Sequence, residues 1–173
     1  MIATAVLATI PLVSAAMIPS TPDLGKAEGR CRANEQGAAL IVDPVGLKDR
    51  KGNLKLEVYP ANDHDFLQDD NVLVSEGKTF RRVEVPVPAA DPVELCVRLP
   101  GPGRYSVMLL HDRDRNRKFG WSEDGVGFAG NPKLSWGKPK AAHAEVVAGP
   151  GLTRLSIVLN YRRGLGMGPL KKN

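Results

Sequence analysis

Short apolar stretches with a two-residue period constrain the fold of this chain more than any other feature. Valines alternate with charged residues in 80–87, and similar alternation recurs in 54–59, 93–99 and 154–161. A period of two is typical of a β-strand that places one face on a core and the other in solvent. The chain also contains 18 glycines and 14 prolines, which favour tight turns between such strands. The pattern therefore indicates an all-β protein.

The number of strand-like stretches predicts the architecture. Residues 38–45 and 105–110 are apolar at most positions, and 144–147 has the length of a short strand. The unbroken apolar run at 105–110 predicts an interior strand covered on both faces, whereas the alternation at 54–59 predicts a strand with one wet face. Seven antiparallel strands predict a two-sheet sandwich of immunoglobulin-like or transthyretin-like type with one long ordered loop; a small closed barrel is the alternative.

Composition divides the chain into four segments. Residues 1–16 are apolar and end in small residues, as in a signal peptide, although no Lys or Arg precedes the run. A buried N-terminal strand or helix is the alternative, and the run is too short to span a membrane. Residues 17–37 form a charged leader, 38–161 the sandwich, and 162–173 a flexible basic tail. We therefore expect a periplasmic or secreted protein without a transmembrane span.

The two cysteines agree with export. Cys31 and Cys96 can form a disulfide, which an oxidising compartment favours. The period of two puts Cys96 on the same face as Glu94 and Arg98, away from the core, so the bridge would fasten the leader over the outside of a sheet. Two independent buried thiols are the alternative. Neither cysteine has a second Cys or a His at metal-ligand spacing, so no zinc site is expected.

The net charge of +5 narrows the class of partner. Basic residues occur in short clusters that Asp and Pro interrupt, whereas a nucleic-acid-binding protein concentrates them on one face. Two Trp, three Tyr and four Phe are too few for a platform that stacks bases. We expect no nucleic acid, weak attraction to an anionic membrane or cell-wall surface, and a monomer with an unknown cell-envelope partner or small ligand.

The segment 111–140 contains most of the residues that could carry chemistry. It follows the most buried strand and runs for about 30 residues, a length that is usually functional in a compact domain. Its aromatic residues Trp121, Phe128 and Trp136 favour a lid that packs on the sandwich. The candidate ligand or surface residues are His111, Asp112, Asp114, Asn116, Lys118, Trp121, Phe128 and Asn131.

Three interpretations of this segment remain open. In the first, its polar side chains cap turns, His111 donates to a loop carbonyl or to Asp112, and the module is non-enzymatic. In the second, calcium binds to oxygen ligands at alternate positions, with Arg117 at the sixth place, where a sharp turn prefers Gly. Its ligands would be Asp112, Asp114, Asn116 and Glu123. In the third, a hydrolase uses His111 with Asp112 or Asp114 as acid and base. No cofactor other than calcium is expected.

The chemistry-bearing motifs of common hydrolases are missing from the sequence. It contains no G-x-S-x-G, no H-E-x-x-H and no phosphate-binding glycine loop. The non-enzymatic interpretation is therefore preferred.

The arrangement of motifs resembles a bacterial family, the domain-of-unknown-function family 2141. The matching runs are residues 46–59, LPGPGRYSV at 99–107, HDRDRNRK at 111–118 and GVGFAGN at 125–131. The resemblance covers roughly residues 38–161. It implies a secreted or periplasmic sandwich of the transthyretin-like kind and no established reaction. The chain departs from the family pattern at Arg117, where the family usually has Gly.

Overall fold

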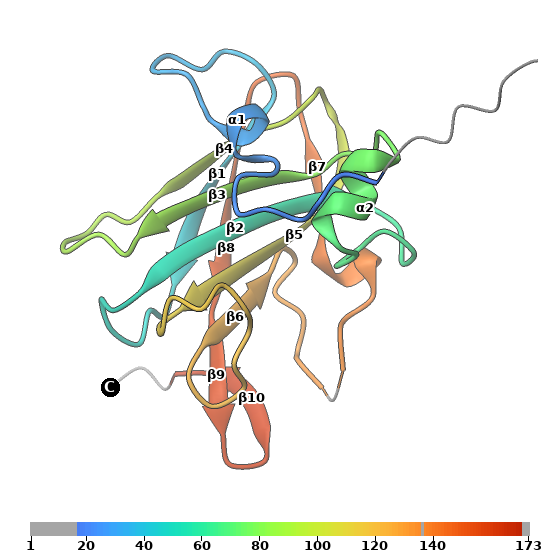
Figure 1. Ribbon diagram of the computed structural model, residues 1–173. Coiled ribbons are helices and arrows are strands. Elements are labelled where there is room, and N and C mark those ends of the chain that lie inside the picture. Colours follow the sequence, from blue (N-terminus) through green and yellow to red (C-terminus); the bar gives the residue numbers. More distant parts are fainter. Residues whose placement is uncertain (1–16, 136, 171–173) are drawn as a thin grey trace, which may run out of the picture.

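The computed structural model describes residues 17–135 and 137–170, which contain ten strands, two short α-helices and one 3-10 helix (Figure 1). In chain order these are α1 (Lys26–Gly29), β1 (Ala39–Val45), β2 (Asn53–Pro60), α2 (Asp70–Ser75), β3 (Arg81–Pro86), β4 (Leu95–Arg98), β5 (Gly103–Asp112), β6 (Gly125–Phe128), η1 (Ala141–Ala144), β7 (Glu145–Ala148), β8 (Leu152–Val158), β9 (Asn160–Arg163) and β10 (Gly166–Pro169).

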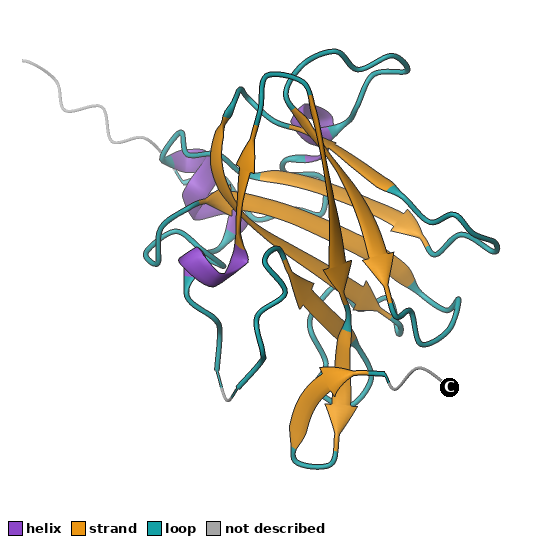
Figure 2. Cartoon of the chain, turned by 180° about the vertical axis from the view of Figure 1, so that it is seen from behind, coloured by secondary structure: helices purple, strands orange, loops and turns teal. Residues whose placement is uncertain are grey.

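The strands form two sheets that pack face to face, which confirms the predicted sandwich (Figure 2). The smaller sheet has the order β4-β1-β8, and the larger has the order β10-β9-β6-β5-β2-β3, with β7 also paired to β5. Leu40, Val58 and Val107 are fully buried in the core of aliphatic side chains between the sheets. One strand pair differs from the predicted antiparallel arrangement: β1 and β8 run parallel to each other.

The described residues contain ten strands where the sequence predicts seven, and glycine explains most of the difference. The sequences of β6 and β10 are GVGF and GMGP, so an apolar residue alternates with Gly and no one-sided pattern results. In β6, a Cβ on Gly125 would overlap the Tyr161 ring, and a Cβ on Gly127 would overlap Ile157. Glycine at these two positions lets β6 lie directly against neighbouring side chains.

The central strand β5 organises the region of interest. One edge of β5 pairs with β2 over eight positions. The other edge pairs with β7 at residues 103–106 and with β6 at residues 108–111. The predicted 30-residue loop is therefore two shorter loops, 113–124 and 129–140, separated by β6.

A second core covers the outer face of the larger sheet. Tyr59, Phe66, Phe80 and Phe128 pack there in edge-to-face pairs with ring centroids 5.5–6.0 Å apart. The leader, α2 and η1 contribute further side chains to this core. The central part of the sheet is consequently buried on both faces, and buried polar groups there require partners.

This burial corrects the prediction of a wet face on β2. Lys55 and Glu57 point away from the main core, as the alternation predicts, yet they are only 8% and 3% exposed. Arg82 of β3 covers Glu57, with its Nε donating to Oε1 over 2.8 Å. Arg82 also donates to carbonyls of the leader, so the leader lies over this charged face.

The Cys31–Cys96 disulfide is present, with the two Cα atoms 5.9 Å apart, and it joins the leader to β4 as predicted. The expected signal peptide, residues 1–16, lies outside the described residues. The expected flexible tail differs from the structure, because residues 162–169 complete the antiparallel β9–β10 hairpin. Among the described residues, no helix combines the length and apolarity needed to cross a membrane.

Candidate functional site

His111, near the end of β5, lies wholly inside the protein. Its side chain is 0% exposed, and both ring nitrogens have partners. Nε2 lies 2.8 Å from the carbonyl oxygen of Lys51, and Nδ1 lies 2.7 Å from the hydroxyl of Tyr161. Because a carbonyl only accepts, Nε2 carries the proton and Nδ1 accepts from Tyr161. Burial lowers the pKa of His111, which favours this neutral form.

Tyr161 completes the arrangement around the imidazole. Its hydroxyl accepts a hydrogen bond from the Lys48 amide over 3.1 Å while it donates to His111. Burial raises the pKa of Tyr161 to about 12, so the phenol keeps its proton. The loop carbonyl that the sequence assigned to His111 is therefore that of Lys51. The hydrogen bonds of the ring do not include Asp112 or Asp114.

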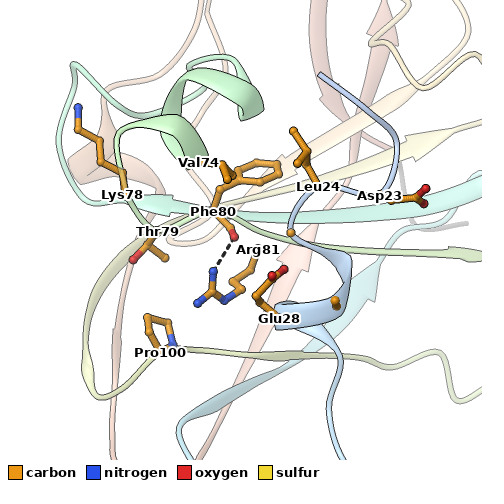
Figure 3. A pocket seen from close by; sticks show the side chains of 12 residues that line it. Asp23, Leu24, Glu28, Val74, Lys78, Thr79, Phe80, Arg81 and Pro100 are labelled. Carbon is orange, nitrogen blue, oxygen red and sulfur yellow. Dashed lines mark hydrogen bonds between the residues drawn. The ribbon is translucent and has the colours of Figure 1, made fainter. Parts of the chain in front are cut away.

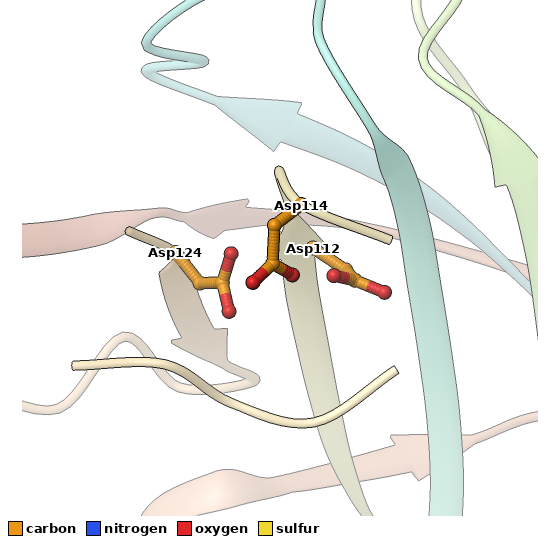
Figure 4. A group of neighbouring side chains, drawn as sticks. All are labelled: Asp112, Asp114 and Asp124. Atoms are coloured by element: carbon orange, nitrogen blue, oxygen red, sulfur yellow. The ribbon is translucent and has the colours of Figure 1, made fainter. Parts of the chain in front are cut away.

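Three aspartates gather just beyond His111, at the exit of β5. Asp112, Asp114 and Asp124 each offer a carboxylate oxygen, and these atoms all lie within 4.8 Å of one another. Figure 4 shows the side chain of Asp114 between those of Asp112 and Asp124. Asp124 joins the group because His111 pairs with Gly125 across β5 and β6, which brings the residue before Gly125 beside the end of β5.

Asp112 is the most confined of the three carboxylates. It is 0% exposed, and its Oδ2 accepts the Arg117 amide over 2.8 Å. Its Oδ1 is buried and has no hydrogen-bond partner among the described residues. Burial raises the pKa of Asp112, the bond from Arg117 opposes this, and the neighbouring carboxyls Asp114 and Asp124 raise it further.

The other oxygens of the group hold the backbone of the loop. Asp124 accepts the amides of Arg113 and Gly120 over 2.8 and 2.7 Å. Asp114 accepts the Asn116 amide, and Asn116 accepts the Lys118 amide. These contacts are the turn-capping roles that the first interpretation gives to the polar side chains.

The loop makes the sharp turn of the calcium pattern without glycine. Arg117, at the sixth place of that pattern, adopts a positive φ of 68°, and Arg115 adopts 62°. Arginine pays a steric cost in this conformation that glycine avoids. The backbone at Arg117 is therefore in a conformation that usually favours glycine.

Glu123, the predicted twelfth-place ligand, is not part of the acidic group. Its side chain is 60% exposed, and Oε2 lies 3.8 Å from Nη1 of Arg113. Asp124 takes its place. The signal that points to Asp124 is its position immediately before the short GVGF strand, which the spacing rule for calcium loops ignores.

The side chain of Arg113 forms its ion pairs with Asp49 and Glu123, outside the three aspartates. Its Nη2 lies 2.5 Å from Asp49 Oδ2, its Nε also donates to Asp49, and its Nη1 donates to the carbonyl of Glu123. The Arg113 guanidinium holds the pKa of Asp49 below its usual range. Arg113, the basic residue that directly follows Asp112, is thus paired with an acid outside the three aspartates.

The remaining candidates are dispersed. Phe128 is buried in the second core, and Trp121 is half-buried. Asn131 tethers the next loop to β8, because its side chain accepts the Val158 amide over 2.7 Å and donates to the Ser156 carbonyl over 3.0 Å. Lys118 is exposed, and Trp136 lies outside the described residues.

A surface pocket of about 420 Å³ lies apart from these residues, between the leader, α2 and β3 (Figure 3). Leu24, Val74 and Phe80 supply its apolar wall, and Arg81 lies at its side, where it donates to the Phe80 carbonyl over 2.8 Å. None of the candidate residues from 111–140 lines this pocket.

Comparison with known proteins gives one match. The pattern of a family described as "Uncharacterized protein conserved in bacteria (DUF2141)" matches residues 42–155, well over half of the chain. No curated protein and no solved structure matches. The matched region runs from β1 into β8 and so includes the acidic group and His111.

Proposed function

We propose that this chain, which belongs to the DUF2141 family of uncharacterised bacterial proteins, is an exported, non-enzymatic β-sandwich module. Its 111–140 segment is a preformed surface that binds an anionic component of the cell envelope.

The observation that carries this proposal is that the polar side chains of the segment form hydrogen bonds with the protein itself. His111 is sealed between Tyr161 and Lys51, and the oxygens of Asp124 hold backbone amides. A general acid or base needs access to a substrate proton, which a side chain with 0% exposure lacks. The same contacts fix the loop in one conformation, which reduces the entropy lost when a partner binds.

Export is supported by the disulfide and by the first residues of the sequence. The Cys31–Cys96 bond holds the leader on β4 and is of a kind that persists in oxidising compartments. The apolar residues 1–16, with their small C-terminal residues, supply a candidate export signal.

The charge of the surface supports an anionic partner. Among the described residues of 111–140, the exposed acidic side chains are Asp114 and Glu123. The exposed basic side chains are Arg115, Lys118, Lys133, Lys138 and Lys140. Arg117 and Lys118 also line a pocket of about 270 Å³ together with Lys55 of β2. This local excess of positive charge attracts anionic lipid or cell-wall polymer and is screened by salt.

The test is cosedimentation of the purified full chain with vesicles that contain anionic phospholipid and with isolated bacterial cell walls. We expect binding at low salt that falls as salt is added. The double variant Lys118→Glu with Lys133→Glu should lose most of the binding. Arg162→Glu, a charge reversal at an exposed position in β9, is the matched control and should bind like the parent.

Three results would contradict the proposal. They are the absence of binding to either material at low salt, an equal loss in the Arg162 control, and retention of the full chain in the cytoplasm after expression in a bacterium. Cell fractionation measures the last of these.

A further inference from the structure

The acidic group at the exit of β5 is short of positive charge. Asp112, Asp114 and Asp124 bring three carboxylates within 4.8 Å, and two of them are buried. Arg113, which follows Asp112 directly, pairs instead with Asp49. Like charges this close repel strongly where water is excluded, so the group needs a counter-charge.

A second observation shows where a counter-charge would lie. Asp112 is 0% exposed, and its Oδ1 has no hydrogen-bond partner among the described residues. A buried carboxylate oxygen without a partner carries a large desolvation cost. The carboxylates beside it are acceptors when ionised and cannot satisfy it. A cation between the side chains satisfies all three.

We propose that Asp112, Asp114 and Asp124 bind a calcium ion at the junction of β5 and β6. Carboxylate oxygens are hard donors, which suit calcium or magnesium rather than thiolate- or imidazole-seeking metals. Calcium is favoured because it accepts irregular geometry and six to eight oxygens, whereas magnesium requires a near-ideal octahedron. Asp114 is exposed, so water completes the shell on that side.

The hydrogen bonds of the group are compatible with this role. Each carboxylate oxygen of Asp124 accepts one amide and keeps a second acceptor position. The bond from Arg117 engages Oδ2 of Asp112 and leaves Oδ1 for the metal. A bound ion would therefore add to the loop contacts without replacing them. This inference goes beyond the proposed function, since it requires neither export nor an envelope partner.

The experiment is calorimetric titration of the chelator-treated full chain with calcium chloride, together with thermal melting in excess calcium or chelator. We expect one calcium per chain and a melting temperature several degrees higher with calcium, because the ion binds only the folded state. Magnesium should bind more weakly under the same conditions.

Two variants test the ligands. Asp112→Asn and Asp114→Asn should each weaken calcium binding by about tenfold or more, because ligand charge sets the affinity of such sites. Asp114 is exposed, so its variant remains informative if Asp112→Asn does not fold. Glu123→Gln is the matched control: it removes an acidic charge from the same loop, outside the group, and should bind calcium like the parent.

The proposal is overturned if the parent chain does not bind calcium, or if Asp114→Asn binds as tightly as the parent. It is also overturned if Glu123→Gln loses affinity while Asp124→Asn keeps it, since the ligands would then be those of the sequence-spacing pattern.

Discussion

Two groups of charged side chains, one on the outer face of β2 and β3 and one at the exit of β5, differ in how their charges are balanced. On the outer face of β2 and β3, Arg82 contacts Glu57 at 2.8 Å and Asp70 at 3.0 Å, and Lys55 lies 3.4 Å from Glu57. At the exit of β5, three aspartates meet, and within residues 17–135 and 137–170 no ion pair joins them to a Lys or Arg. The first group has two charges of each sign, whereas the second has three negative charges.

This difference in charge balance suggests different roles: the balanced group stabilises the fold, whereas the acidic group is suited to bind a ligand. The balanced group is complete without a ligand, and its Arg82 also fixes the leader through the carbonyls of Thr21 and Pro22. Tyr59 adds a further hydrogen bond to Glu57, and burial raises the pKa of Tyr59 well above its usual value, so its hydroxyl remains a donor. The acidic group lacks such a complement. A buried network that is short of a partner is the more informative place to look for function.

The largest expected effect comes from breaking the balanced group. Arg82→Met leaves the buried Asp70 without its cation and Glu57 with Lys55 alone, which should cost about 3–5 kcal/mol of unfolding free energy. Urea denaturation followed by circular dichroism measures the loss. The control is Arg154→Met, whose guanidinium is 57% exposed and pairs with Asp43 and Glu94. Its cost should stay within about 1 kcal/mol, and equal losses in the two variants would contradict the comparison.

Replacing a carboxylate by its neutral amide in the presence of chelator should change the stability less. The change should have opposite signs in the balanced group and in the acidic group. Glu57→Gln removes a charge that Arg82 needs and should destabilise by about 1–3 kcal/mol. Asp112→Asn relieves repulsion and leaves an oxygen to accept from Arg117, so stability should rise by up to about 1 kcal/mol. Denaturant melts of both variants give the signs. A loss of equal size in both would show that the acidic group is already neutralised.

The smallest effect concerns pH and a single paired carboxylate. Asp65 lies 2.6 Å from Lys78 Nζ, and this bond, with those from His64 and Asn62, holds the pKa of Asp65 well below its usual range. The contribution of Asp65 to the free energy of unfolding is therefore complete above about pH 4, where this carboxyl is ionised in the unfolded chain. It is lost as the pH falls below that value. Asp65→Asn should lower stability at neutral pH and flatten its decline in acid. An unchanged acid slope in melts across this range would contradict the assignment.

The sequence predicts the sandwich well because its strands carry a one-sided pattern. The outward position of Cys96 follows from counting residues along a strand, and the disulfide to the leader confirms it. The same counting fails for β6, where Gly125 and Gly127 replace apolar residues to make room for Tyr161 and Ile157. Packing of that kind depends on partners far away in the sequence.

The acidic group is less predictable from the sequence, because the register between β5 and β6 decides which residues belong to it. Asp112 and Asp114 follow from local spacing, but Asp124 enters only through the pairing of His111 with Gly125. Counting along a calcium loop selects Glu123, which the structure leaves exposed. Similarly, the alternation in β2 gives the direction of Glu57 correctly but cannot reveal that Arg82 and the leader will cover it.

The parallel pairing of β1 with β8 determines how the molecule bears tension. Seven positions of β1 lie opposite seven of β8, from Ala39 with Leu152 to Val45 with Val158. Because β1 runs parallel to β8, a force that draws the start of β1 away from the end of β8 loads the whole ladder in shear, and its hydrogen bonds share that force. The antiparallel β9–β10 hairpin, pulled from its free end, opens one bond at a time. The Cys31–Cys96 bond keeps the 65-residue span between them from extending, and at about 3.5 Å per residue this withholds roughly 200 Å of chain. A pull on the chain before Cys31 therefore passes through the disulfide to β4, and β1 stays inside the protected span.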